Sequence, residues 1–208
     1  MLDDKGFDLW ADEYDGDVLT SDEENSYPFA GYKRVLLDIY QTVLTRKNPV
    51  VLDIGFGTGK LLTKLFAQGC DVYGQDFSAK MIESVSKKVP ATRLFQKDFS
   101  TGLDERLMQK SFDFIIATYS LHHLTDEQKV PLLRTLQTLL KPEGMILIGD
   151  VAFETCKGLD DCRRTVGDGW DTDEIYFVVE EMRRFFPNLA FQPFSFCSGV
   201  LKLGKETE

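Results

Sequence analysis

The chain of 208 residues carries 34 acidic and 24 basic residues, a formal net charge of −10 at pH 7. Such an excess of negative charge disfavours a surface that must neutralise many phosphate groups, so nucleic-acid binding is not expected. The length fits a single α/β domain with a substantial core. No apolar run approaches the ~20 residues that a membrane span needs, and the first residues lack a secretory signal, so we expect no membrane partner and a cytoplasmic location.

The cysteines and histidines limit the chemistry open to the chain. The four cysteines form no Cys-x-x-Cys pair, and the two histidines are adjacent, at His122 and His123. A zinc site needs three or four such ligands, so the sequence predicts no metal site. The cysteines are expected to be reduced and mostly structural.

The first predicted element is a short amphipathic helix over residues 7–14, with an aromatic stripe at Phe7, Trp10 and Tyr14. Such stripes usually pack on a core, and we expect this of Phe7. For Trp10 and Tyr14 the alternative is a lid over a bound cofactor, because a loop over residues 15–28 would let the helix move. A second helix is predicted over residues 29–46, before Asn48-Pro49.

Residues 50–61 predict a strand, a tight turn and the start of a helix. The segment Val50 to Ile54 is branched or aliphatic apart from Asp53, as in a strand buried on both faces, and a helix is predicted over residues 60–68. Alternating glycines let the backbone approach a ligand at the turn. They are Gly55, Gly57 and Gly59.

The glycine spacing and the preceding acid distinguish two kinds of nucleotide cofactor. The dinucleotide fingerprint G-x-G-x-x-G needs its third glycine where Lys60 stands, so the match is imperfect. Asp53 would repel a pyrophosphate but suits a ligand with ammonium and sulfonium charges, such as S-adenosylmethionine. The pattern D-x-G-x-G-x-G resembles the first motif of the class I methyltransferases, in which this loop surrounds the methionine end of that cofactor. A turn that binds nothing is the alternative on this motif alone.

Two further acids follow the next two predicted strands. Asp76 ends a strand over residues 71–76, where a carboxylate can accept both hydroxyls of a ribose. Asp98 follows a strand over residues 91–96. Because the carboxyl ends of parallel strands converge on one crevice, Asp53, Asp76 and Asp98 form a constellation that favours a cofactor site over solvated acids.

The resemblance to class I methyltransferases assigns roles to these and to neighbouring residues. The contacts expected to matter most are Gly55, Asp76 and Asp98, the last accepting from the adenine amino group. Those expected to shape the loop are Asp53, Gly57 and Gly59. Phe77 and Phe99 are expected to flank adenine, and Thr118 to lie near the methionine end.

The run from residue 112 to residue 151 also resembles this family, in which a strand, a histidine-containing loop, a helix and a Lys-Pro-x-Gly turn recur. Here a strand is predicted over residues 112–118, and Leu-His-His-Leu follows at 121–124. A capping box at residues 125–128 opens a long helix, and a fifth strand begins at Met145 after the turn.

Beyond Phe153 the resemblance fades. Helices are predicted over residues 159–166 and 173–186, and closing strands over 191–197 and 200–205, joined at Ser198-Gly199. The Phe-x-x-Trp-Ala-x-x-Tyr-Asp run and Phe-Ala-Gly-Tyr at 29–32 resemble a group of small bacterial methyltransferases of unassigned substrate.

The expected fold is therefore α/β and Rossmann-like, with a seven-stranded, mostly parallel sheet and helices on both faces. The family order is 3-2-1-4-5-7-6, with the last strand antiparallel. Within one domain over residues 1–208, we expect N-terminal helices and a lid over 1–48 and a cofactor-binding core over 49–153. Residues 154–208 are expected to supply substrate-side helices and the closing hairpin.

Methyl transfer from S-adenosylmethionine is an in-line displacement that leaves S-adenosylhomocysteine, so positioning and water exclusion can supply much of the rate. A general base is needed only for a protonated acceptor, and the candidates are His122, His123, Tyr14 and Tyr119. Adjacent helical residues point about 100° apart, so at most one histidine should face the site. The alternative for each histidine is to pack the loop and donate to backbone.

The absence of two motifs narrows the chemical class of the methyl acceptor. No Asn/Asp-Pro-Pro-Tyr follows the fourth strand, where Ala117-Thr118-Tyr119-Ser120 stands, and no Pro-Cys nucleophile for cytosine carbon is present. Together with the acidic charge, this favours a small-molecule acceptor, enclosed by the N-terminal helices and residues 154–170.

Three alternatives stay open. The first is an RNA-modifying methyltransferase, with a basic rim at Arg163-Arg164 and Arg183-Arg184, pairs that are more typical of solvated helix faces. The second is a regulatory protein that binds the cofactor without turnover. The third, an NAD-dependent oxidoreductase, is disfavoured by Asp53 and by the glycine spacing.

Overall fold

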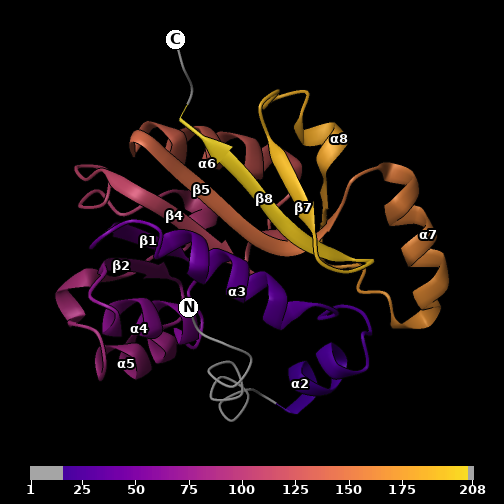
Figure 1. Ribbon diagram of the computed structural model, residues 1–208, viewed down its shortest axis with the longest axis horizontal. Helices are drawn as coiled ribbons and strands as arrows, with labels where there is room; N and C mark the ends of the chain where they lie inside the picture. Colours follow the sequence, from indigo (N-terminus) through magenta and orange to yellow (C-terminus); the bar gives the residue numbers. More distant parts are fainter. Residues whose placement is uncertain (1–15, 206–208) are drawn as a thin grey trace.

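A single mixed β-sheet forms the centre of the computed structural model, which describes residues 16–205 (Figure 1). Its strand order is β3-β2-β1-β4-β5-β8-β7, and neighbouring strands from β3 to β5 run parallel. β8 is antiparallel to both β5 and β7. The order and the reversed last strand confirm the predicted Rossmann-like sheet. The strands are β1 (Val50–Ile54), β2 (Asp71–Asp76), β3 (Leu94–Gln96), β4 (Phe112–Thr118), β5 (Leu140–Phe153), β7 (Ala190–Pro193) and β8 (Ser198–Gly204).

The helices connect these strands. The α-helices are α2 (Gly16–Glu23), α3 (Tyr32–Val43), α4 (Lys60–Ala67), α5 (Ala79–Ser86), α6 (Asp126–Thr138), α7 (Cys156–Val166) and α8 (Val179–Met182). Short 3₁₀ turns are η1 (Ala91–Arg93), η2 (Phe99–Thr101), η3 (Leu121–His123) and η4 (Gly167–Gly169). Within residues 16–205, each helix is too short or too polar to cross a bilayer.

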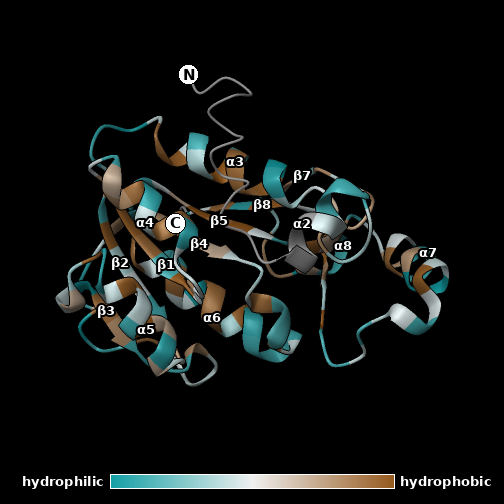
Figure 2. Ribbon diagram, turned by 90° about the horizontal axis from the view of Figure 1, so that it is seen from below, coloured by the Kyte–Doolittle hydropathy of each residue, from teal (hydrophilic) through white to brown (hydrophobic). Residues whose placement is uncertain are grey.

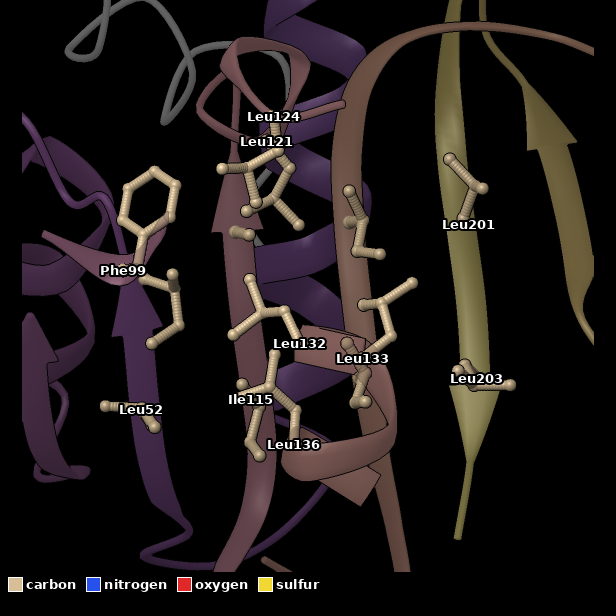
Figure 3. Close-up of a cluster of buried hydrophobic side chains, with 14 of the residues drawn as sticks. Leu52, Phe99, Ile115, Leu121, Leu124, Leu132, Leu133, Leu136, Leu201 and Leu203 are labelled. Carbon is tan, nitrogen blue, oxygen red and sulfur yellow. The ribbon is translucent and has the colours of Figure 1, made fainter. Parts of the chain in front are cut away.

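Hydrophobic cores cover both faces of the sheet. Side chains alternate along a strand, so Val51 packs with α3, α4 and Val85 of α5, whereas Leu52 packs on the face that α6 and α8 cover. Figure 2 shows α3 and α6 on opposite sides of the sheet. In Figure 3, Leu132 and Leu136 of α6 lie beside Ile115 of β4, and the same cluster includes Leu201 and Leu203 of β8. Both faces are thus occupied by core, which leaves the carboxyl edge of the strands for ligands.

The segment after Asp15 corrects the predicted loop over residues 15–28. The structure has a helix there, α2, which ends at Glu23. Lys33 of α3 lies 3.9 Å from an oxygen of Asp22 and 3.7 Å from one of Glu23. These tertiary ion pairs hold a segment whose own sequence pattern gave no helix signal.

The predicted helix over residues 173–186 is also largely wrong. Phe177 and Val178 form a short additional strand, β6, which pairs with β5, and only Val179–Met182 is α-helical. The Ile175 N–H donates to the carbonyl of His122 at 2.8 Å. Backbone pairing with the sheet edge and with η3 therefore replaces helical hydrogen bonds in the first part of this segment.

The closing hairpin differs from its predicted boundaries. Ser198 and Gly199 lie within β8, opposite Val151 and Asp150, instead of forming the turn. The turn occupies residues 194–197, where the Phe194 and Ser195 N–H groups donate to the Ser198 carbonyl. Residues 91–93 likewise form η1, which shortens the predicted third strand to Leu94–Gln96.

Candidate functional site

The glycine turn joins β1 to α4 at the carboxyl edge of the sheet. All three glycines have left-handed backbone conformations, with φ values of 69°, 53° and 70° for Gly55, Gly57 and Gly59. The Gly55 N–H donates to the Gln75 carbonyl at 2.8 Å, which fixes the start of the turn against β2. A side chain would strain any of these positions.

The three glycines serve different purposes. A Cβ at Gly55 would lie 2.6 Å from the Cβ of Ser120, and one at Gly59 would lie 2.5 Å from Cγ2 of Val85 on α5. A Cβ at Gly57 would meet no described atom within 4 Å. Gly55 and Gly59 therefore allow close packing, whereas Gly57 presents its backbone to open space where a ligand can lie.

Asp76, at the end of β2, holds this turn in place. Its Oδ2 accepts from the Gly57 N–H and its Oδ1 from the Ser78 N–H, both at 2.8 Å. A carboxylate offers about four lone-pair directions, so Asp76 keeps the capacity to accept two more hydrogen bonds. The role of ribose acceptor stays a prediction, and this spare capacity leaves room for it.

Asp53 is the most buried acid of the predicted constellation, at 1% exposure. Its Oδ1 has no hydrogen-bond partner among the described residues. Burial, and then the negative charge of Asp76, raise the pKa of the Asp53 carboxyl to about 8. An unpaired buried carboxyl is costly, and a cationic ligand group would relieve that cost.

The predicted adenine contacts lie at the ends of β2 and β3. Phe77 is 65% exposed, and the Asp98 carboxylate is exposed, with its Oδ1 accepting from the Ser100 N–H at 2.8 Å. Phe99, labelled in Figure 3, is buried and belongs to the core that α6 covers. Its ring edge lies near Gly55, because a Cβ at Gly55 would lie 3.1 Å from Cε1 of Phe99. Asp98 and Phe77 are therefore accessible to a ligand, whereas Phe99 packs in the core beside the glycine turn.

A cavity of about 160 Å³ adjoins the glycine turn. Three aromatic rings close one side of it, with centroids 4.7 Å apart for Tyr32 and Tyr119, 5.6 Å for Phe29 and Tyr119, and 5.8 Å for Phe29 and Tyr32. The residues that line it include Phe29, Tyr32, Gly55, Gly57, Thr118 and Tyr119. Thr118 therefore lies on the wall of this cavity, and its role near the methionine end stays a prediction.

Phe29 and Tyr32 were missed as individual site residues by the sequence analysis. Both residues belong to the run Phe-Ala-Gly-Tyr at 29–32, which was interpreted only as part of the resemblance to small bacterial methyltransferases. Tyr119 was a candidate base, but burial and the nearby Asp150 raise the pKa of its phenol well above the usual value. Its φ of 49° is unusual for a bulky residue and turns its ring toward Phe29 and Tyr32.

His122, a second candidate base, is buried between two carboxylates. Its Nδ1 lies 2.6 Å from Oδ1 of Asp150, and its Nε2 lies 3.2 Å from Oε1 of Glu174. Burial alone would lower the pKa of this imidazole, but the two carboxylates outweigh burial and raise it to about 10. His122 is therefore a poor proton acceptor at neutral pH. His123 is exposed, which agrees with one histidine at most facing inward.

Asp150 and Glu174 were not predicted as site residues. Asp150 follows the same rule as the other strand-end acids, because it lies near the carboxyl end of β5. Glu174 gave no such signal, since its segment was predicted as helix. Trp10 and Tyr14 lie outside the described residues, so the predicted lid stays a prediction.

Comparisons with known proteins agree with this architecture. The family described as "Methyltransferase domain" matches residues 51–144. An uncharacterized methyltransferase of Alkaliphilus oremlandii is 30% identical over 177 residues, which cover 85% of this chain and 78% of that protein. One from Anoxybacillus flavithermus is 37% identical over 147 residues, 71% of this chain and 66% of that protein.

Solved structures share the fold at lower identity. The crystal structure of magnesium protoporphyrin IX methyltransferase from Synechocystis PCC 6803, with bound SAH, superposes with a TM-score of 0.68 at 19% identity. The superposition covers 97% of this chain and 95% of that one.

Proposed function

Because this chain belongs to the class I S-adenosylmethionine-dependent methyltransferases, we propose that it methylates a small-molecule acceptor by in-line displacement. The observation that carries the proposal is the arrangement at the carboxyl edge of β1 and β2. There, a buried carboxyl without a partner, an open glycine backbone and a carboxylate with spare acceptor capacity surround one turn. These residues are Asp53, Gly57 and Asp76.

These residues fit the cofactor group by group. Asp76 would accept the ribose hydroxyls while keeping its bond to the Gly57 N–H. Asp53 would pair with the positive charge of the methionine end, in a buried place where an ion pair is strong. Asp98 and Phe77, accessible at the ends of β2 and β3, would contact adenine.

The cofactor supplies a methyl group on a sulfonium that is already a good electrophile. The task of the chain is therefore to align the reactants and to keep water out. Phe29, Tyr32 and Tyr119 are suited to this because their rings close the cavity beside Thr118. The N-terminal helices would enclose the acceptor on the same side.

The arginines of the predicted basic rim form ion pairs with acidic residues, which favours a small-molecule acceptor over RNA. Arg164 pairs with Asp161 at 2.9 Å, and Arg183 pairs with Glu154. These partners neutralise two arginines of the basic rim that an RNA substrate would require. The net charge of −10 points the same way.

The test is a labelling experiment with purified protein and methyl-tritiated S-adenosylmethionine. A bacterial extract is separated into small molecules, RNA and protein, and each fraction is offered as acceptor. We expect label in the small-molecule fraction, and its loss in the variant Asp76→Ala but not in Glu143→Gln, an exposed control near the start of β5, at the opposite end of the strand from the carboxyl edge. Label in the RNA fraction would refute the acceptor class, and absence of cofactor binding by calorimetry would refute the site.

A further inference from the structure

Two histidines and a glutamate converge at a place that the cofactor site does not use. His122 and His123 belong to η3, and Glu174 lies in the segment before β6. One potential ligand atom from each residue lies within 4.8 Å of those from the other two. The hydrogen bond from the Ile175 N–H to the His122 carbonyl, at 2.8 Å, holds the two segments together.

We propose that His122, His123 and Glu174 form a binding site for a divalent transition-metal ion of the Zn²⁺ type. Two imidazoles and one carboxylate are a donor set that proteins use for zinc with an open fourth position. Ligands at about 2.0 Å from a tetrahedral zinc ion lie roughly 3.3 Å apart. The observed separation of Nε2 of His122 and Oε1 of Glu174 is 3.2 Å, so this pair already has the required spacing.

Two further side chains orient these ligands. Oδ1 of Asp150 lies 2.6 Å from Nδ1 of His122, which directs Nε2 toward Glu174. The Tyr176 hydroxyl donates to Oε2 of Glu174 at 2.8 Å, which leaves Oε1 facing the histidine. Asp150 and Tyr176 are both buried. A carboxylate behind a metal-binding histidine is the usual support for such a ligand, so the arrangement is that of a built site.

The charge of the cluster also favours a cation. The Asp150 and Glu174 carboxylates flank a single imidazole, and Oδ2 of Asp150 is buried without a hydrogen-bond partner among the described residues. In the metal-free protein a proton on Nε2 can bridge to Glu174. On binding, the metal ion takes that place, the Nε2 lone pair forms the metal–nitrogen bond, and the proton leaves to solvent.

An ion can reach this place from outside. His123 is exposed, and Glu174 lines a cavity of about 370 Å³ with Asp126, Trp170 and Tyr176. This cavity shares no lining residue with the one at the glycine turn. Metal binding at the histidine cluster can be measured directly, without cofactor and without turnover.

The experiment measures Zn²⁺ binding to the untagged full chain by calorimetry and by equilibrium dialysis with metal analysis. Visible absorption of the Co²⁺-loaded protein reports whether nitrogen ligands surround the ion. We expect one ion per chain, and at least tenfold weaker binding in His123→Ala and in Glu174→Gln. Glu181→Gln is the matched control, because Glu181 lines the same cavity but lies outside the cluster. Cys156→Ser, in the same cavity, should also bind like wild type.

Three results would overturn the proposal. One is wild-type protein that binds no ion, and another is undiminished binding in both folded cluster variants. The third is loss of binding in Cys156→Ser, which would place the ion on the thiol. If Glu174→Gln does not fold, the exposed position His123 and the Co²⁺ spectrum of the wild type decide the question.

Discussion

The glycine turn and the histidine cluster lie at the same carboxyl edge of one sheet, but they are assembled differently. The turn takes its groups from residues 53–59 and from Asp76 at the end of the adjacent strand. The cluster joins His122 and His123 to Glu174, with Asp150 behind His122, and these residues come from three separate segments. A contiguous motif carries its geometry in its own backbone, whereas the cluster exists only once the fold has brought β4, β5 and the β6 segment together.

Ser120 connects the two regions mechanically. Its hydroxyl donates to the Ile54 carbonyl at 2.9 Å, and its Cβ occupies the space that a side chain at Gly55 would need. Ser120 also immediately precedes η3, which carries both histidines. A change at Gly55 should therefore disturb both regions, and a change at Gly57 only the turn.

The largest expected effect is that of Gly55→Ala on stability. A left-handed alanine costs about 1–2 kcal/mol, and displacing Ser120 adds an overpacking cost of about 1–3 kcal/mol, so we expect a loss of about 3 kcal/mol. Gly57→Ala should lose only the conformational part, because its Cβ meets open space. Urea unfolding measures both. Equal losses in the two variants would show that Ser120 does not couple the turn to η3.

The second prediction concerns cofactor affinity. Asp76→Ala removes a charged acceptor of the ribose hydroxyls and the tie to the Gly57 N–H, which should cost about 2 kcal/mol, roughly thirtyfold in affinity. Asp71→Ala is the control on the same strand, since Asp71 pairs with Arg93 away from the carboxyl edge. Calorimetric titration with S-adenosylmethionine compares them. Equal affinity in both variants would remove Asp76 from the site.

The contrast between the contiguous glycine turn and the assembled histidine cluster also explains which parts of the structure were predictable from the sequence. The strand order was predicted from the resemblance to the class I family. The glycine turn and the acids at 53 and 76 follow from local patterns, because a parallel strand, its turn and its end-acid are contiguous. The close approach of Gly59 to Val85 was not predictable residue by residue, although the glycine itself was.

The histidine cluster shows why the rest was not predictable. No local pattern pairs His122 with Glu174, and the helical pattern over residues 173–186 gave way to pairing with β5. The expectation of no metal site rested on counting cysteines and histidines. It did not consider a carboxylate brought in from a distant segment, which is the arrangement behind the proposed site. Asp150 was the exception, because its strand-end position made it recognisable by the rule already applied to Asp53.

The third prediction uses the raised pKa of Asp53. The folded pKa of about 8 lies above the usual value of 3.8, so the folded state keeps a proton that the unfolded state has lost. The contribution of the Asp53 carboxyl to the free energy of unfolding is therefore complete below about pH 4 and decreases as the pH rises toward 8. Between pH 6 and pH 7, wild type should lose at most about 1.4 kcal/mol relative to Asp53→Asn.

Urea unfolding of both proteins at the two pH values isolates this effect, because all other titrating groups are shared. Wild type and Asp53→Asn should differ in how steeply their free energy of unfolding falls with pH. Saturating S-adenosylmethionine should reduce this difference, since a cation beside Asp53 favours the charged carboxylate. Parallel pH profiles of the two proteins without cofactor would mean that Asp53 is already ionised and has another partner.

The smallest effect is expected for Tyr176→Phe, which tests most directly whether the glycine turn and the histidine cluster are separate sites. Tyr176→Phe removes the hydroxyl that donates to Glu174 and that also contacts the Tyr27 hydroxyl, which should cost about 1 kcal/mol of stability. The matched control is Tyr73→Phe, whose hydroxyl makes a long 3.5 Å contact with Asp71 and should cost less. Because Tyr176 does not line the cavity at the glycine turn, S-adenosylmethionine affinity should be unchanged. Weaker cofactor binding in Tyr176→Phe, with normal stability, would show that the two regions form one site.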